Sequence, residues 1–202
     1  MPGPIVNTCP DGNCAGANLS GQNLAGADLT GINLNHADLA NSNLEGADLR
    51  GVDLRGANLT GADLRGAILD KAQMQKAVAK GADFKKAVLN SLNAQGTNFK
   101  NAHFNKASLK RINLMRANLT GANLQGAKLA DALMQAVTAK GTNFKNAILT
   151  AANAKAGNFK NANFNKANMR QINLVNANMT GATVNGSNLK GAKLRGTRGL
   201  NQ

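Results

Sequence analysis

The chain has 202 residues, of which 24 are Lys or Arg and 10 are Asp or Glu, so its formal net charge at pH 7 is +14. Aromatic residues make up only 3% of it, with no Trp and no Tyr, which excludes a globular core built on large aromatic side chains. There is no apolar run long enough to cross a bilayer and no basic start followed by an apolar stretch, so we expect a cytoplasmic protein without membrane insertion.

Residues 1–16 differ from the rest of the chain and are predicted to form an N-terminal cap. All three prolines lie within the first ten residues, at Pro2, Pro4 and Pro10. Proline interferes with strand pairing, so this composition suits the end of a stacked structure. Both cysteines, Cys9 and Cys14, flank a Pro-Asp-Gly turn that suits a small disulfide loop. Two reduced thiols are the alternative, as is usual for a cytoplasmic protein.

From Ala17 to Gly196 an apolar residue recurs at every fifth position without insertion or deletion. The 36 recurring residues, called central residues below, run from Leu19 to Leu194 and comprise 21 Leu, 6 Phe, 4 Met, 4 Ala and 1 Val. The residue two before the central one is Ala in 24 of the 36 cases, the residue one before is mostly Asn or Asp, and the last residue of the unit is often Gly. A period of five fits neither a helix nor a strand, so it indicates a solenoid in which each unit forms one side of a coil.

This pattern, Ala-(Asp/Asn)-Leu-x-x, resembles the motif of the pentapeptide repeat proteins over residues 17–196. The resemblance implies an all-β fold, a right-handed quadrilateral parallel β-helix with four pentapeptides in each coil. The 36 units would then form about nine coils. Residues 197–202 remain as a short C-terminal tail.

A longer repeat supports four pentapeptides per coil without the resemblance. Residues 81–124 align with residues 141–184 at an offset of sixty, which is three coils of twenty residues. With this period, Phe99 and Phe159 lie over Ala79 and Ala139, so a large side chain packs on a small one. We therefore expect all six Phe side chains to lie inside the rod.

Charge is distributed unevenly along the sequence. Residues 1–49 contain five acids and no Lys or Arg, whereas the remaining residues contain all 24 bases. With a period of twenty, one column of bases comprises Lys80, Lys100, Lys140 and Lys160. The next side is predicted to carry Lys85, Lys106, Lys145 and Lys166, with Lys86 beside them. These nine lysines are candidates for binding an anion or a macromolecular partner. The alternative is a solvated surface that was copied with the sixty-residue unit.

Some positions that normally hold Asn or Asp are apolar. Ile68, Val88 and Ile148 occupy this position along one predicted side. Scattered apolar surface residues are common, but the neighbours Ile68 and Val88 are a candidate apolar patch for a partner.

Catalytic and metal-binding patterns are not evident. His36 and His103 lie on different coils without a predicted nucleophile near them, and the acids mostly occupy the turn-forming position. The glycines are phased with the repeat and do not form a phosphate-binding loop. We therefore expect no enzyme activity, no cofactor and no metal site.

These observations predict a non-enzymatic binding or scaffold protein that presents flat sides to a macromolecular partner, a protein, as a monomer or an end-to-end dimer. The alternative is binding of a polyanion, either nucleic acid or an anionic surface, through the lysine columns. The family resemblance adds a third hypothesis, because some members mimic DNA and modulate gyrase. DNA mimicry requires an acidic surface, and the net charge of +14 argues against it.

Overall fold

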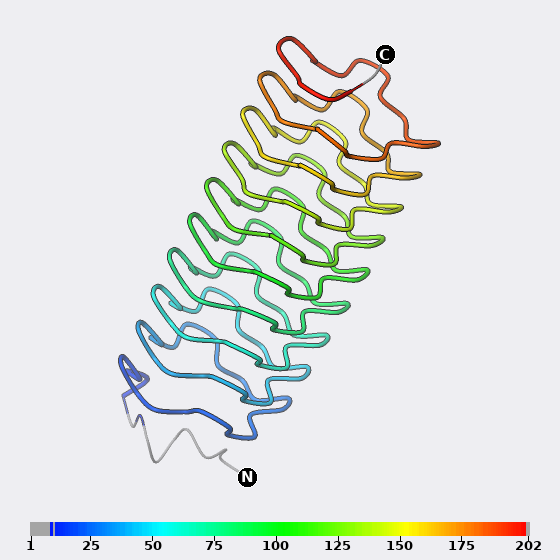
Figure 1. Cartoon of the computed structure of the whole chain (residues 1–202). Coiled ribbons are helices and arrows are strands. Elements are labelled where there is room, and N and C mark those ends of the chain that lie inside the picture. Colours follow the sequence, from blue (N-terminus) through cyan, green and yellow to red (C-terminus); the bar gives the residue numbers. More distant parts are fainter. Residues whose placement is uncertain (1–8, 10, 201–202) are drawn as a thin grey trace.

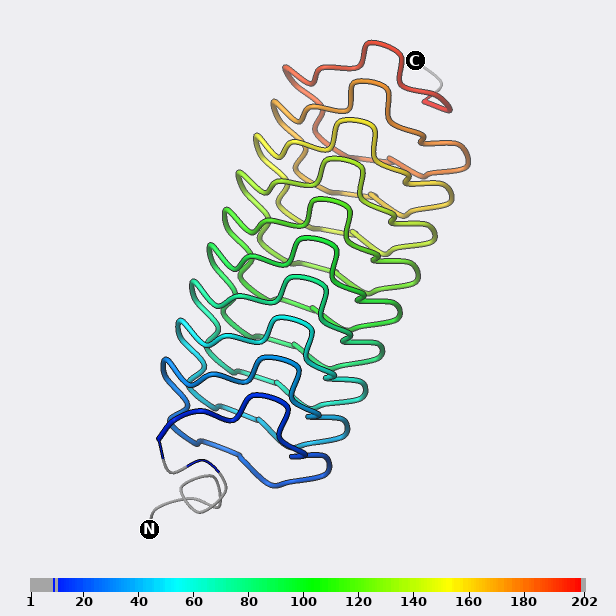
Figure 2. The same cartoon turned by 90° about the vertical axis from the view of Figure 1, so that its left-hand side faces the viewer.

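The computed structural model describes Cys9 and residues 11–200 (Figure 1). Within this part the chain forms no helix and no strand longer than one residue. Isolated parallel β-bridges instead join residues twenty apart, from Asn13 with Asn33 to Asn178 with Arg198. Each coil thus contains four pentapeptides, as expected, and Figures 1 and 2 show the coils stacked into one elongated rod.

The four sides of the rod are numbered here by their bridge residues. Side 1 contains residues 18, 38 and every twentieth residue to 198; side 2 contains residues 23 to 183 in the same steps. Side 3 contains residues 28 to 188, and side 4 contains residues 13 to 193.

A pentapeptide with Asn or Asp before its central residue can pair all of its backbone N–H groups. In residues 57–61, four N–H groups donate to carbonyl oxygens at 2.6–3.1 Å. The fifth, that of Thr60, donates to Oδ1 of Asn58 at 3.2 Å. Because an unpaired backbone group is costly, the Asn or Asp before the central residue has a structural role as the fifth acceptor.

The corner between two sides has a left-handed backbone. The residue two after the central one has positive φ at each corner, for example 65° at Gly81 and 59° at Lys106. Nineteen residues other than Gly adopt this conformation among those described. The hydrogen-bonded coil therefore imposes the corner geometry even where the residue does not favour it.

The central residues fill the inside of the rod. All of them from Leu19 to Met179 are buried, including all six Phe, as predicted. Phe84 stacks on Phe104 with ring centroids 4.8 Å apart, and Phe99 lies edge-on to both. An equivalent cluster, sixty residues later, is formed by Phe144, Phe159 and Phe164.

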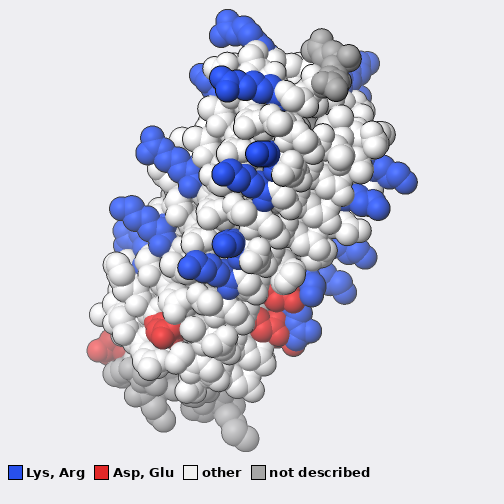
Figure 3. Space-filling model, viewed as in Figure 1, with Lys and Arg blue, Asp and Glu red and all other residues white. Residues whose placement is uncertain are grey.

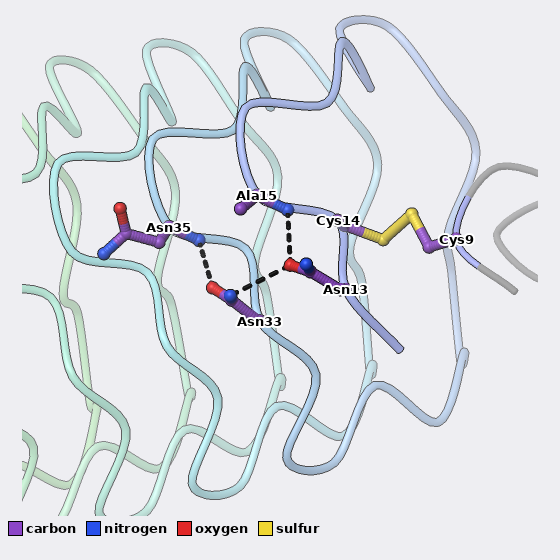
Figure 4. Close-up of a disulfide and its surroundings, with 6 residues drawn as sticks. All are labelled: Cys9, Asn13, Cys14, Ala15, Asn33 and Asn35. Carbon is purple, nitrogen blue, oxygen red and sulfur yellow. Dashed lines mark hydrogen bonds between the residues drawn. A yellow bond between two sulfur atoms is a disulfide. The ribbon is translucent and has the colours of Figure 1, made fainter. Parts of the chain in front are cut away.

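The two ends of the rod differ. At the N-terminal end the Cys9 and Cys14 side chains point inward, are buried and form a disulfide, with Cα atoms 5.2 Å apart (Figure 4). Bridge pairing already includes Asn13, inside the segment expected to be a cap. The predicted roles of Pro2, Pro4 and Pro10 lie outside the described residues. At the other end Val184, Leu189 and Leu194 are only partly buried.

Candidate binding surface

The turn-forming Asn and Asp side chains also hold several of the predicted lysines in place. The backbone N–H of Lys100 donates to Oδ1 of Asn98 at 3.2 Å, and that of Lys160 donates to Oδ1 of Asn158 at 3.3 Å. Lys145 has the same contact with Asn143, at 3.1 Å. The main chain at these lysines is thus fixed, while the charged ends extend into solvent.

The lysine column on side 1 is interrupted. Lys80 and Lys100 lie on successive coils, as do Lys140 and Lys160, because residues 78, 98, 118, 138 and 158 are joined by consecutive bridges. Thr120 occupies the equivalent position between the two pairs. Side 1 therefore presents two pairs of lysines rather than a continuous row.

The second predicted group is divided between a side and a corner. Lys85 and Lys145 follow central residues of side 2, whereas the remaining three lysines occupy the next corner with φ of 59°: Lys86, Lys106 and Lys166. Lys85 also contacts an acid, since its Nζ lies 3.0 Å from Oδ2 of Asp83. The structure thus leaves Lys85 less available than the other four.

Ion pairs gather in the acidic coils. Within the described residues, all five pairs lie between Glu45 and Lys85. Three Asp residues each accept from an Arg two positions later, with N···O distances of 2.5 Å for Arg50 on Asp48, 2.6 Å for Arg55 on Asp53 and 2.7 Å for Arg65 on Asp63. These hydrogen bonds lower the pKa of the three carboxyl groups below the ordinary 3.8.

The other twenty bases have no ion-pair partner in the described part of the chain, and they surround the rod. Ten bases and one acid lie in residues 71–116, the first basic zone, and six bases without an acid lie in residues 140–170, the second basic zone. Residues 117–139, the neutral zone, contain only Lys128 and Asp131 as charged residues. Figure 3 shows bases along both edges of the rod and acids toward its N-terminal end. The period of twenty had assigned nine lysines to two neighbouring sides.

The most exposed large apolar side chains are not those of the predicted patch. Ile68 and Val88 are paired by a bridge on side 3, as predicted, but both are half-buried. The exposed large apolar side chains are instead Leu133 and Ile148, with 39% and 38% of their surface accessible. Sequence reasoning passed over Leu133, although it too replaces an Asn or Asp.

The surface has shallow depressions but no grouped metal ligands. One depression of about 310 Å³ is lined by Gln75, Lys76, Gln95, Gly96 and Arg116. His36 lies at the corner after side 4 and His103 lies on side 2, so the histidines are separated. Among residues 9 and 11–200, no three His, Cys, Asp or Glu side chains are grouped as metal ligands. The same residues include no helix suited to crossing a membrane.

Comparison with known proteins agrees with the repeat. The model of the family "Pentapeptide repeats" matches in eight copies, and the matched ranges include residues 13–51, 47–85, 67–105, 82–121, 97–135 and 158–196. The chain belongs to the pentapeptide repeat family. No curated protein sequence matches this pentapeptide repeat protein.

Several solved structures are similar to this chain. HetL, a protein involved in heterocyst differentiation regulation from the cyanobacterium Nostoc sp. strain PCC 7120, is 26% identical over 98% of both chains, with a TM-score of 0.49. A trypsin-treated variant of QnrB1, a plasmid-mediated fluoroquinolone resistance protein, is 16% identical over 90% of this chain and 88% of its own, with a TM-score of 0.66. Full-length QnrB1 is 17% identical over 82% of this chain and 90% of its own, with a TM-score of 0.53. QnrB1 is a right-handed quadrilateral β-helix, and the likeness shows that fold here.

Proposed function

We propose that this pentapeptide repeat protein is a non-enzymatic scaffold whose rod, of about nine coils, docks an acidic protein. The observation that carries the proposal is the set of twenty bases without an ion-pair partner among the described residues. Charges held on a rigid surface create a strong positive potential, which attracts an acidic partner and orients it.

The rigidity of the rod supports this role. Most backbone N–H groups are hydrogen-bonded and every central residue from Leu19 to Met179 is buried, so the sides have little freedom to rearrange. A preorganised surface loses less entropy when it binds.

A protein partner suits the surface better than a nucleic acid does. All six Phe side chains are buried, so none of them stacks on a base. The lysine pairs on side 1 are separated by Thr120, and the two basic zones are separated by a neutral zone. A phosphate backbone lying along the rod would therefore contact separate groups of bases rather than a continuous row.

Affinity capture with charge variants tests the proposal. We expect the wild-type chain to retain a specific acidic protein from an extract of its source organism, and the variant with Gln at Lys80, Lys100, Lys140 and Lys160 to lose it. A matched variant removes four charges from sides 3 and 4 by placing Gln at Lys110, Lys190, Lys193 and Arg195. Retention by the matched variant supports docking on side 1. Equal loss in both variants, or retention in both, contradicts it.

Polyanion binding is the second candidate, favoured by the lysine pairs on side 1. It requires an affinity for duplex DNA that falls steeply with salt, because each neutralised phosphate releases counterions. The same Gln variant at Lys80, Lys100, Lys140 and Lys160 should then weaken DNA binding without unfolding the rod.

Gyrase modulation by DNA mimicry is disfavoured. The likeness to QnrB1 concerns the fold, and the net charge of +14 is opposite in sign to that of a DNA mimic. A supercoiling assay with gyrase should show neither inhibition nor protection from a quinolone.

A further inference from the structure

Leu133 and Ile148 lie on adjacent sides of the rod, one coil apart. Leu133 is bridged to Asn113 and Asn153 on side 4, and Ile148 is bridged to Lys128 and Asn168 on side 3. Both occupy the position whose Asn or Asp normally accepts the fifth N–H of the pentapeptide. An apolar side chain here removes that acceptor and exposes apolar surface, so folding alone does not account for it.

Three neighbouring corners are also apolar, whereas the corner directly before Leu133 holds Asp131. Ala136, Ala151 and Ala156 have φ of 53–56° and are exposed. They are the only alanines with positive φ in the described part of the chain, and all three lie in the two coils that contain Leu133 and Ile148. Glycine would fit a left-handed corner with less strain. Leu133, Ala136, Ile148, Ala151 and Ala156 are called the apolar patch below.

Bases surround the apolar patch. Lys128 and Lys155 are exposed within the same coils, and Arg116 and Arg170 are exposed on the coils before and after them. None of the four forms an ion pair with a described residue. Asp131, the only acid after Asp83, is exposed at the corner directly before Leu133, so the four bases outnumber a single carboxylate around the patch. An apolar centre with a cationic rim is complementary to a segment with aliphatic side chains and flanking carboxylates.

We propose that the apolar patch docks an acidic protein segment whose aliphatic side chains cover Leu133 and Ile148. This inference rests on the proposed function and adds a second contact to the side 1 lysines, on sides 3 and 4 at the neutral zone and the start of the second basic zone. The carboxylates of the segment pair with Lys128, Lys155 and the two rim arginines. A nucleic acid gains nothing from aliphatic side chains at this place, whereas a protein segment buries them.

Two labelled peptides test the inference by fluorescence anisotropy at physiological salt. Both contain the same number of Glu residues, and one carries two central Leu where the other carries Ser. We expect the wild-type rod to bind the Leu peptide about tenfold more tightly, because covering part of two aliphatic side chains is worth roughly one factor of ten.

A double variant, Leu133→Asn with Ile148→Asn, should abolish the preference for the Leu peptide. Asn is the commonest residue at this position of the repeat, so the variant should retain the melting temperature of the wild type. The matched control, Ile68→Asn with Val88→Asn, makes the same change at half-buried positions of side 3 and should keep the preference.

The outcomes separate the inference from the proposed function. Equal binding of both peptides by the wild type, or an unchanged preference in the Leu133→Asn, Ile148→Asn variant, overturns the patch while leaving acidic docking intact. If neither peptide binds, both proposals are overturned.

Discussion

At the scale of single residues, the inward side chains stabilise the rod through contact between coils. Phe99 packs edge-on against Phe84 and Phe104, with ring centroids 5.8 and 5.2 Å away. It is fully buried, and Ala79 lies below it in the preceding coil. Aromatic burial of this kind contributes both transfer free energy and specific ring contacts.

Replacing Phe99 with Ala should lower the free energy of unfolding by about 3–5 kcal/mol, because the neighbouring rings cannot fill the cavity. Chemical denaturation measures this loss. Phe159→Ala should cause a comparable loss, since Phe159 occupies the same place in the second aromatic cluster. A near-neutral result for Phe99→Ala would contradict its inward position.

The Asp–Arg pairs predict how stability responds to acid. Hydrogen bonds from Arg50, Arg55 and Arg65 lower the folded-state pKa of Asp48, Asp53 and Asp63 below 3.8. Their contribution is therefore present above the ordinary carboxyl pKa and is lost as the pH falls through the lowered folded values. We expect the melting temperature to decrease on acidification below pH 3.8.

A charge variant checks the cause of this decrease. Gln at Arg50, Arg55 and Arg65 removes the partners and should flatten the acid dependence. Gln at Lys71, Lys76 and Lys110, which form no ion pairs within the described residues, should leave it as in the wild type. The effect will be modest because the three arginines are exposed to solvent.

At the scale of the pentapeptide, the left-handed corner is the main source of local strain. Gly81 has φ of 65°, and a Cβ added there would meet no other atom within 4 Å. Ala156 has φ of 56° at the same position of another pentapeptide, at a different corner of the rod. Gly81 therefore separates the effect of backbone conformation from that of packing.

Gly81→Ala should destabilise the rod by about 1 kcal/mol, because an L side chain disfavours positive φ. Ala156→Gly should change stability in the opposite direction or leave it unchanged, since relief of strain competes with greater entropy of the unfolded chain. Thermal melts of both variants measure the difference. Destabilisation by Ala156→Gly and stabilisation by Gly81→Ala would show that the corners are not left-handed.

The repeat in the sequence predicts most of the fold because each position of the pentapeptide has one structural role. Central residues such as Phe99 and Leu109 could be assigned inward from the period alone, and the sixty-residue offset indicated a coil of twenty. The relative exposure of Ile68 and Leu133 could not be predicted in this way. It depends on side chains from the coils above and below, which a single pentapeptide does not specify.

The lysine positions show the same limit. The period placed Lys80 and Lys100 on one side correctly, but it did not separate Lys86, Lys106 and Lys166, at left-handed corners, from Lys85 on the adjoining side. Pairing of Lys85 with Asp83 depends on side-chain conformation two residues along the same turn. The candidate surface was therefore recognised in outline, while its available charges required the structure.

At the scale of the whole molecule, the rod has an acidic N-terminal part and a basic remainder. Residues 1–49 contain no Lys or Arg, and the 24 bases lie beyond them. Sixteen of these bases lie in the two basic zones and are spread over all four sides, so only a fraction of them face any one partner. A stiff duplex on one side would contact few of them, whereas a protein segment can follow a corner or a side.

The most direct test of the central claim is fluorescence anisotropy of a labelled duplex DNA from low to physiological salt. We predict binding at low salt that disappears at physiological salt, because the few bases on one side give a weak and strongly screened attraction. Tight duplex binding that persists at physiological salt would contradict a protein partner and make the rod a nucleic-acid-binding protein.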